Sequence, residues 1–458
     1  MDATLVSAWT TLCQELAPAF TTPTLLTFTH LLSGWVMCRG RAVVTNFICA
    51  IGASLLGQAA KHWTAYEKFF HRAAWEPDEL SRLLLQRVVE PLLEREGQDG
   101  QWVDLLVDDS TAGRCGDRVA FAGYFKDASV GNAKTKVVHW SHNWIIGVIG
   151  IGLSRWRGWV TGLPVLAALY RKPQDCDPDH PFATRQELAA RLIRQTHAAL
   201  PRRRIRVKTD GQYATKEVAA ATFEVDGVLI SRLRSDSALF ALPPQRRRRG
   251  RRGGKRRRGR RLPTPKAMAR STSGWRTIYV LLHGKRVRRR VKSRVCLWWH
   301  VAKDHPIKVV IVKNPAGKGR RDDYLFSTDP SMSEQQVIEH YAGRWPVEEA
   351  IRDAKQFDGL EQTAGWCPRT VLRQAPLALF KQTLVKAWYL GCADALAKQA
   401  PAAQRPWQAP KDHPSYRDML AALRRTLWKR RVKALNSARS GRVDDAIKSL
   451  VFTLCEAA

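Results

Sequence analysis

Acidic residues are scarce in this sequence relative to basic ones. The 458 residues include 41 Asp and Glu against 76 Lys and Arg, which gives a formal net charge of +35 and a pI of about 10.4. An excess of this size repels itself unless a polyanion neutralises it, and nucleic acid is the commonest such partner. The densest basic run, Arg246 to Arg261, holds 12 of these charges and leaves +23 spread over the rest of the chain. A single basic tail therefore does not explain the excess.

Long hydrophobic runs and paired cysteines are also missing. The most apolar stretch, Trp144 to Tyr170, is interrupted by Arg155 and Arg157, and no run reaches the roughly 18 to 20 apolar residues that span a bilayer. The sequence MDATLVSAWT at the start lacks the positive charge that begins a signal peptide. The nine cysteines form no Cys-x-x-Cys pair, which argues against a disulfide framework and favours reduced thiols. These absences predict a soluble, cytoplasmic protein.

The first 98 residues are predicted to be helical. Apolar residues recur at helical spacing between Leu25 and Val36, and again between Leu80 and Leu93. Basic and aromatic residues are interleaved between Lys61 and Arg72. This segment is therefore either a helical DNA-binding domain or an ordinary helical bundle with a basic face, and the sequence does not separate the two.

An α/β unit is predicted to follow. A short apolar strand, Trp102 to Val107, ends at Asp108, and a second, Ile205 to Val207, leads to Asp210. Between them, two apolar runs predict a β-hairpin, and a capping box that begins at Thr184 predicts a helix. Strands and helices in this order indicate a mixed sheet flanked by helices.

The second half of the chain changes character twice. The Arg/Gly run from Arg246 to Arg261 is expected to be disordered when free, and β-branched runs between Trp275 and Ser327 predict a β-rich insertion. The helical pattern returns at Ser333, where a second capping box runs to Gln336. The predicted division is a helical N-terminal domain, the first part of an α/β core, the insertion, a core helix and a basic helical C-terminal region, over residues 1–98, 99–233, 234–332, 333–370 and 371–458.

Three acidic residues are candidates for one shared site. Asp108 and Asp210 each follow a predicted strand, and a helix can bring the carboxylate of Glu348 to the same edge of the sheet. Converging carboxylates repel one another unless cations neutralise them, and two Mg²⁺ ions in such a site activate a nucleophile and stabilise the leaving oxygen in phosphodiester cleavage. Taken singly, an Asp at a strand end is more often a turn residue or a helix cap, and Asp109 is an alternative to Asp108.

A set of residues around Glu348 follows a more specific pattern. Its members are Tyr341, Arg344, Glu348 and Lys355. Their successive spacings of three, four and seven put all of them on one face of a helix, which combines a metal ligand with groups that bind phosphate and sugar. Pro346 works against one continuous helix, unless a new helix starts at Trp345 with the proline as its first residue.

These blocks resemble those of bacterial insertion-sequence transposases with an RNase-H-like DDE core. The segment around Glu348 is similar to their Tyr-x2-Arg-x3-Glu-x6-Lys signature, and the sequences at Asp108 and Asp210 are similar to their two aspartate strands. The resemblance covers about residues 20–370. It implies cut-and-paste transposition, in which DNA is cleaved at the terminal inverted repeats of an element and the freed 3′-hydroxyl attacks target DNA.

The resemblance also implies roles for particular residues. The metal ligands would be Asp108 (or Asp109 in its place), Asp210 and Glu348, and the DNA contacts would be Tyr341, Arg344 and Lys355. Trp345 would pack or stack. The cofactor would be Mg²⁺ or Mn²⁺, as two ions, and the enzyme would act as a homodimer on paired ends of double-stranded DNA, at the nucleoid in the bacterial cytoplasm.

The arginine run is a separate candidate for contact with the DNA backbone. Its basic residues are Arg246, Arg247, Arg248, Arg249, Arg251, Arg252, Lys255, Arg256, Arg257, Arg258, Arg260 and Arg261. We expect them to bind phosphates without reading sequence.

Two other functions compete with transposition. One is a domesticated, non-catalytic DNA-binding protein, and an intact acidic set argues against it, because acids without metals are unfavourable next to DNA. The other is a nuclease of the same fold that cuts but does not join. His139 and His142 are weaker metal candidates, since a hydrogen-bonded core histidine is the commoner role for such residues.

Overall fold

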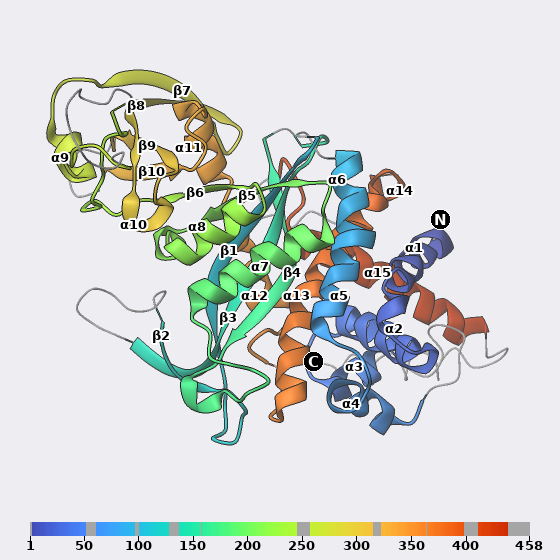
Figure 1. Ribbon diagram of the computed structural model, residues 1–458. Coiled ribbons are helices and arrows are strands. Elements are labelled where there is room, and N and C mark those ends of the chain that lie inside the picture. Colours follow the sequence, from blue (N-terminus) through green and yellow to red (C-terminus); the bar gives the residue numbers. More distant parts are fainter. Residues whose placement is uncertain are drawn as a thin grey trace.

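The protein, described here from a computed structural model, is built around one large mixed β-sheet with helices on its faces and at its side (Figure 1). The structure describes residues 2–51, 61–96, 100–127, 137–156, 158–244, 257–314, 322–362, 364–397 and 411–437. The strands follow the order β2-β3-β1-β5-β6-β10-β9-β8-β7, and β4 pairs with β3 beside this path.

The centre of the sheet carries the first two predicted acids. β1 (Trp102–Gly113) is parallel to β5 (Arg204–Thr209) on one side and antiparallel to β3 (Val137–Gly152) on the other. β6 (Val228–Arg232) lies parallel to β5, and β4 (Val160–Tyr170) lies antiparallel to β3. The short strand β2 (Gly123–Asp127) also pairs with β3. The predicted mixed sheet and the predicted hairpin are therefore present.

β1 is longer than the sequence indicates, and the predicted strand end at Asp108 is wrong. Pairing with β5 stops at Val107 and Thr209. Pairing with β3 continues for six more residues, from Asp108 opposite Ile146 to the end of β1. The hydrogen bonds to β3 thus carry the strand past two aspartates, a residue type that is rare in strands.

The β-type segments of the predicted insertion form strands that extend the same sheet. β10 (Asp323–Ser327) pairs antiparallel with both β6 and β9 (Pro306–Val312), and β8 (Lys285–Leu297) and β7 (Arg276–Leu282) follow outward. β8 ends at Leu297, and the β-branched pattern after it is interrupted by the short helix α10 (Trp299–Ala302). In Figure 1 this part of the chain is the lobe at the upper left.

Helices form most of both ends of the chain. Their bounds are α1 (Asp2–Gln14), α2 (Thr22–Met37), α3 (Val44–Ile51), α4 (Trp63–His71), α5 (Pro77–Leu83), α6 (Glu90–Glu96), α7 (Arg185–Ala199), α8 (Lys216–Glu224), α9 (Pro265–Arg270), α11 (Glu334–Ala342), α12 (Pro346–Phe357), α13 (Pro368–Gly391), α14 (Ala393–Ala397) and α15 (Tyr416–Ser437). Both expected capping boxes are present: Thr184 with Glu187 begins α7, and Ser333 with Gln336 begins α11.

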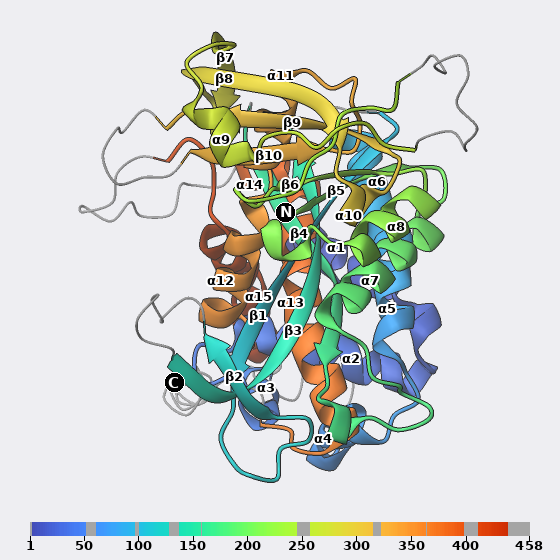
Figure 2. The ribbon, with the colours of Figure 1, turned by 60° about the vertical axis from the view of Figure 1, so that its left-hand side comes forward.

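Helices cover both faces of the central strands (Figures 1 and 2). α7 packs on one face and α12 on the other, while α13 runs along β4. Two side chains of α13 fix it there: Thr383 Oγ1 donates to the carbonyl of Pro164 at 2.7 Å, and Lys386 Nζ donates to that of Gly162 at 2.6 Å. Both anchors are buried, so α13 is a structural support of the sheet.

The N-terminal and C-terminal helices share one hydrophobic core with the sheet. A continuous buried cluster includes Trp9 of α1, Ile146 of β3 and Leu427 of α15. Trp388 of α13 donates from Nε1 to the carbonyl of Leu5 at 2.9 Å. The N-terminal helices are therefore packed into the rest of the molecule through this core. None of the helices in the described ranges is long and apolar enough to cross a membrane, and the eight cysteines within those ranges are free thiols.

Candidate active site

Asp108 and Asp210 lie at the same level on two neighbouring parallel strands, as predicted. Val107 of β1 is in register with Thr209, the last residue of β5, so the next residues are the two acids. Neighbouring strands are about 4.8 Å apart, which puts the two backbones close together. Asp210 Oδ1 also accepts a hydrogen bond from the Gln212 backbone N–H at 2.8 Å and caps a short 3₁₀ turn. The ordinary capping role of a strand-end Asp is therefore present alongside its place among the acids.

Asp108 and Asp109 point to opposite faces of the sheet, because side chains alternate along a strand. Asp108 lies on the α12 face, where Arg344 donates to its Oδ2 at 2.9 Å. Asp109 lies on the α7 face, where Asn143 Nδ2 and the Tyr213 hydroxyl each donate to it at 2.9 Å. The geometry favours Asp108 over Asp109 as the partner of an acid on α12.

The signature segment forms two helices joined by a short turn. α12 begins at Pro346 with Trp345 as its N-cap, where the missing N–H of proline costs nothing because the first helical turn has no partner for it. The alternative of a new helix at the proline is thus confirmed. The single-face arrangement does not hold, since Tyr341 belongs to α11 and Glu348 to the first turn of α12.

Arg344, in the turn between the two helices, joins two of the acids. Its guanidinium donates to Asp108 Oδ2 at 2.9 Å and forms a second, short ion pair with Glu348 Oε1. The Arg344 side chain is only 12% exposed. Burial raises the pKa of Asp108 to about 6; Arg344 opposes this rise, and the neighbouring Asp210 carboxylate adds to it. Negative charge is therefore crowded at this edge of the sheet, and one arginine does not fully compensate it.

Tyr341 and Arg232 complete this side of the site. The centre of the Tyr341 ring lies 5.6 Å from the Arg232 guanidinium and 5.9 Å from that of Arg344. Burial raises the pKa of Tyr341, although both arginines oppose the rise. The phenol therefore stays protonated at neutral pH and can donate a hydrogen bond.

One predicted DNA-contact residue, Lys355, lies away from this group. Lys355 is two turns along α12 from Glu348, about 10 Å by helical rise, and pairs with Glu361 at 3.1 Å. The Trp345 side chain is 48% exposed. It therefore contributes little to the core, and its ring is accessible for stacking.

Gly162 of β4 allows α12 to sit directly on the sheet. A Cβ atom at this position would lie 2.7 Å from the Pro346 carbonyl oxygen and 2.9 Å from a methyl of Val148. Any larger residue would push the first turn of α12 outward. The glycine therefore sets the distance between the first turn of α12, which carries Glu348, and the sheet.

A buried charge network under the acids escaped the sequence reading. Asp104, on the same face of β1 as Asp108, accepts from Arg206 Nε and Lys208 Nζ of β5 at 2.6 Å each. Arg206 also lies 3.5 Å from the His340 ring of α11. Alternation puts Arg206 and Lys208 on one face of β5, but the sequence does not show that Asp104 lies opposite them. Lys208 is only 3% exposed, so it serves this network and is not accessible to a phosphate.

His142 is a core histidine, as its commoner role suggests. Arg114 Nε donates to its Nδ1 at 2.8 Å, and its Nε2 contacts the carbonyl of Ala120 at 2.8 Å. Burial and Arg114 lower the pKa of His142 to about 4. Both ring nitrogens are in use, so His142 is not a metal ligand.

Part of the arginine run can be described. Residues 245–256 lie outside the described ranges, and with them Arg246 to Arg256 of the predicted DNA-binding set. Arg257 pairs with Asp304 at 2.6 Å, and Arg258 stacks on Phe240 with its guanidinium 4.5 Å from the ring centre. The end of the run is therefore anchored to the sheet extension, so the expected disorder does not reach these residues.

Across the described parts of the chain, no group of three or more His, Cys, Asp or Glu side chains is arranged to hold a metal ion. At the predicted site, Arg344 lies between Asp108 and Glu348. The three carboxylates are thus near one another, and a guanidinium links two of them.

Two family models match the chain. One, described as a DDE superfamily endonuclease, matches residues 15–293 and includes Asp108 and Asp210. The other, described as the archaeal putative transposase ISC1217, matches residues 298–390 and includes Glu348; its archaeal description leaves the expected bacterial origin unconfirmed. No curated protein matches. Because the first match spans more than half of the sequence, the chain belongs to the DDE superfamily of endonucleases.

Proposed function

We propose that this protein is a cut-and-paste DNA transposase that cleaves the ends of its element and joins the freed 3′-hydroxyl to target DNA. The observation that carries the proposal is the meeting of Asp108, Asp210 and Glu348 at one edge of the sheet. The two family matches, one of them to a transposase, cover the three positions between them.

The topology supports an RNase-H-like core. Three antiparallel strands, β4, β3 and β1, are continued by β5 and β6, which run parallel to β1. The two aspartates lie on the central strand β1 and directly after its parallel neighbour. β10, β9, β8 and β7 then extend the sheet, and they come from the segment between the second aspartate and Glu348. This segment is the proposed insertion.

The residues present fit divalent cations. Carboxylate oxygens are the ligands that Mg²⁺ prefers. Burial raises the pKa of Asp108 and the Asp210 carboxylate adds to the rise, and a bound cation would favour the charged form. Asp108, Asp210 and Glu348 would be the ligands. Two bound ions would supply an activated water or 3′-hydroxyl and stabilise the oxygen that leaves.

The protein's own cations would position the DNA. Arg344 lies beside both Asp108 and Glu348, and on release from either it can form a bidentate contact with a phosphate. The Tyr341 hydroxyl can donate to a phosphate or sugar oxygen next to it, and Lys355 would contact the strand two turns further along α12. Two copies of the chain would hold the two ends of the element.

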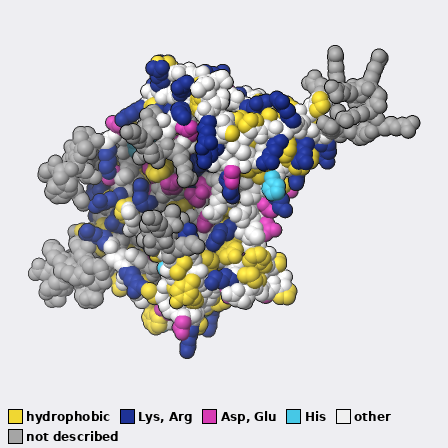
Figure 3. All heavy atoms as spheres, turned by 90° about the vertical axis from the view of Figure 1, so that its left-hand side faces the viewer, with side chains coloured by type: hydrophobic (Ala, Val, Ile, Leu, Met, Phe, Trp, Pro, Cys, Tyr) yellow, Lys and Arg dark blue, Asp and Glu magenta, His cyan; other side chains and the backbone are white. Residues whose placement is uncertain are grey.

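A second DNA-binding surface is supplied by the sheet extension. Residues 257–314 contain 17 Lys and Arg and a single acid, Asp304. Alternation along β8 puts five of the cations on the face away from the hydrophobic cluster around Val291: Arg286, Arg288, Arg290, Lys292 and Arg294. On the face of the molecule shown in Figure 3, acidic side chains gather near the middle and Lys and Arg occupy much of the surrounding surface. Such a field favours an approaching polyanion.

A nuclease that cuts without joining is the second candidate, favoured by the description of the longer family match as an endonuclease. The two functions differ in their products. Incubation with Mg²⁺ and DNA that carries the terminal repeats should yield cleaved ends and, for a transposase, ends covalently joined to target DNA. Cleavage with no joined product would establish the nuclease.

The acids themselves are tested by substitution. Asp108→Asn, Asp210→Asn and Glu348→Gln keep side-chain volume, and each should lower the cleavage rate by at least about 1,000-fold, with double variants no worse than single ones. DNA binding in Ca²⁺ should survive, because Lys and Arg elsewhere provide the affinity. Asp109→Asn is the matched control and should retain cleavage.

Three outcomes would change the proposal. Near-normal cleavage by Asp210→Asn or Glu348→Gln would overturn the transposase assignment. Normal cleavage by Asp108→Asn together with an inactive, folded Asp109→Asn would move the first ligand by one residue. Normal DNA binding with no cleavage by the unaltered protein would favour a non-catalytic DNA-binding protein.

A further inference from the structure

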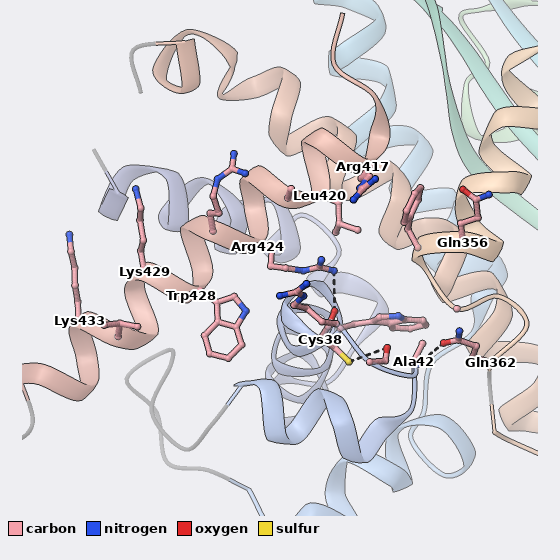
Figure 4. A pocket seen from close by; sticks show the side chains of 18 residues that line it. Cys38, Ala42, Gln356, Gln362, Arg417, Leu420, Arg424, Trp428, Lys429 and Lys433 are labelled. Carbon is pink, nitrogen blue, oxygen red and sulfur yellow. Dashed lines mark hydrogen bonds between the residues drawn. The ribbon is translucent and has the colours of Figure 1, made fainter. Parts of the chain in front are cut away.

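A basic pocket lies at the far end of α12 from Glu348 (Figure 4). Its volume is about 1130 Å³. Three parts of the chain line it: the end of α2 with the loop that follows, the end of α12 with the residues after it, and one side of α15. The pocket thus joins the N-terminal and C-terminal helices to the helix that carries the third acid.

The charged residues of the lining are all basic. The lining includes six basic residues and no Asp or Glu: Arg39, Arg417, Arg424, Arg425, Lys429 and Lys433. Arg424 has a structural role, since it donates to the carbonyls of Val36 and Cys38 at 2.8 and 3.0 Å and closes the end of α2. Four others, Arg39, Arg417, Arg425 and Lys429, are exposed and form no hydrogen bond or ion pair with another described residue. Like charges that gather without acids favour an anionic ligand.

The spacing of the α15 cations indicates an extended ligand. Arg417, Arg425, Lys429 and Lys433 differ by multiples of four positions, so they form a row that winds gradually around the helix. Figure 4 shows three of them along α15. From the first to the last, the row is about 24 Å long by helical rise. A free phosphate covers a small part of that length, whereas about seven base pairs of duplex DNA cover all of it.

The floor of the pocket is apolar and aromatic. Trp428 is half-buried, and its Nε1 donates to the carbonyl of Met37 at 3.3 Å, which fixes the orientation of the ring. Trp35 and Phe357 lie beneath the same space. A cationic edge over an aromatic floor is suited to a sugar–phosphate strand, because phosphates meet the cations while sugars and bases meet the rings.

We propose that this pocket binds the phosphodiester backbone of DNA along α15, as a contact separate from the acidic site. The proposal rests on the proposed function, because the ligand would be the same DNA that reaches the acids. Glu348 and Phe357 mark the two ends of α12, about 14 Å apart by helical rise. The two residues lie on opposite sides of α12, so DNA that leaves the acidic site and passes around α12 would reach the pocket at least about four base pairs away.

The test is the salt dependence of DNA binding by the full chain in Ca²⁺, measured by fluorescence anisotropy with a labelled 30-base-pair duplex and a labelled 30-nucleotide single strand. The pocket variant is Arg417→Gln, Arg425→Gln and Lys429→Gln together. Loss of three phosphate contacts should make the slope of log affinity against log salt shallower by about 2.7 for duplex and about 2.1 for single-stranded DNA. A loss confined to one of the two DNAs identifies the form that the pocket holds.

A matched control removes the same charge elsewhere. Arg82 of α5 and Arg191 and Arg194 of α7 are exposed and paired with acids on α5 and α8. Their triple change to Gln should leave the slope within about 0.5 of the unaltered protein. Equal slopes for both triple variants, or complete competition by millimolar inorganic phosphate, would overturn the pocket. If the unaltered protein binds no DNA, the proposed function fails as well. If the unaltered protein does not cleave DNA but the pocket variant still binds DNA more weakly, the DNA-binding role of the pocket is supported and the proposed transposase activity is not.

Discussion

At the scale of the residue, the role of each acid on β1 depends on the face of the sheet to which its side chain points. Asp104 and Asp108 are four residues apart and share the α12 face, whereas Asp109 faces α7. Asp104 is neutralised by Lys208 and Arg206, and Asp109 is held by Tyr213 and Asn143. Asp108 is left with one arginine that it shares with a second acid. The same residue type on one strand therefore supplies a structural ion pair, a structural hydrogen-bond acceptor and a candidate ligand.

Asp104 gives a pH-dependent prediction. Burial alone raises its pKa, but Lys208 and Arg206 outweigh burial and lower the pKa to about 2. A carboxyl whose pKa is lowered by folding stabilises the protein above its unfolded pKa of about 3.9, and this contribution is lost as pH falls toward 2. Asp104→Asn should therefore lower the free energy of unfolding by about 3 to 5 kcal/mol at pH 7.

The measurement is urea unfolding of the protein and the variant from pH 7 to pH 2.5. The difference between their unfolding free energies should be constant down to about pH 4 and shrink below it. Asp104 would not be the ionised centre of this network if the difference stayed unchanged down to pH 2.5.

The acids and their neighbours differ in how far the sequence predicts them. Asp108, Asp210 and Glu348 each stand in a recognisable local pattern. The adjacency of the first two follows from the short apolar strand that precedes each of them. The network of Asp104 depends on the register of β5 against β1 and on the approach of α11, which join residues about 100 and more positions apart. Local sequence carries no signal for such a register, so the ion pairs could be seen only in the structure.

At the scale of the element, α12 is placed by its contact with β4. The Pro346 carbonyl rests on Gly162, where the absence of a side chain permits the approach. Gly162→Ala should push the first turn of α12 away from the sheet and move Glu348 relative to Asp108. A shift of about 1 Å at a catalytic group can cost on the order of 100-fold in rate, and overpacking costs about 1 to 3 kcal/mol of stability.

Cleavage rate, unfolding midpoint and DNA affinity of Gly162→Ala would be measured together. The rate should fall while affinity in Ca²⁺ stays the same, because the cations are untouched. Gly113→Ala is the control, since a Cβ at Gly113 of β1 meets no atom within 4 Å. Full cleavage by Gly162→Ala would show that the contact between α12 and Gly162 does not position Glu348.

Elements were predictable where their signals are local. Capping residues predicted the starts of α7 and α11, and turn residues between apolar runs predicted the β3–β4 hairpin. The length of β1 was not predictable, because its second half is stabilised by hydrogen bonds to β3 and not by its own composition. For the same reason, the joining of β10 to β6, which brings the predicted insertion into the central sheet, had no local signature.

At the scale of the whole molecule, positive charge is spread over distinct surfaces. The outer face of β8 is one, the pocket beside α15 is a second, and the start of the Arg/Gly run lies outside the described residues. Composition predicted a nucleic-acid partner, but not which surfaces would carry the excess. The surface on which each cation lies depends on the alternation of side chains along a strand and on the packing of the helices.

The β8 face gives the last prediction. Arg286, Arg288 and Arg290 alternate on the outer side of the strand and are spaced to meet phosphates without reading bases. Changing all three to Gln should weaken binding to DNA with the terminal repeats and to unrelated DNA by the same factor, about 10-fold or more at physiological salt. The same variant of Arg82, Arg191 and Arg194 controls for net charge. Competition binding of the two DNAs measures the factor directly. Loss of affinity for the repeats alone would mean that β8 reads sequence, and the surface would then have to enter a groove of the DNA, as a two-stranded ribbon of β7 and β8 can.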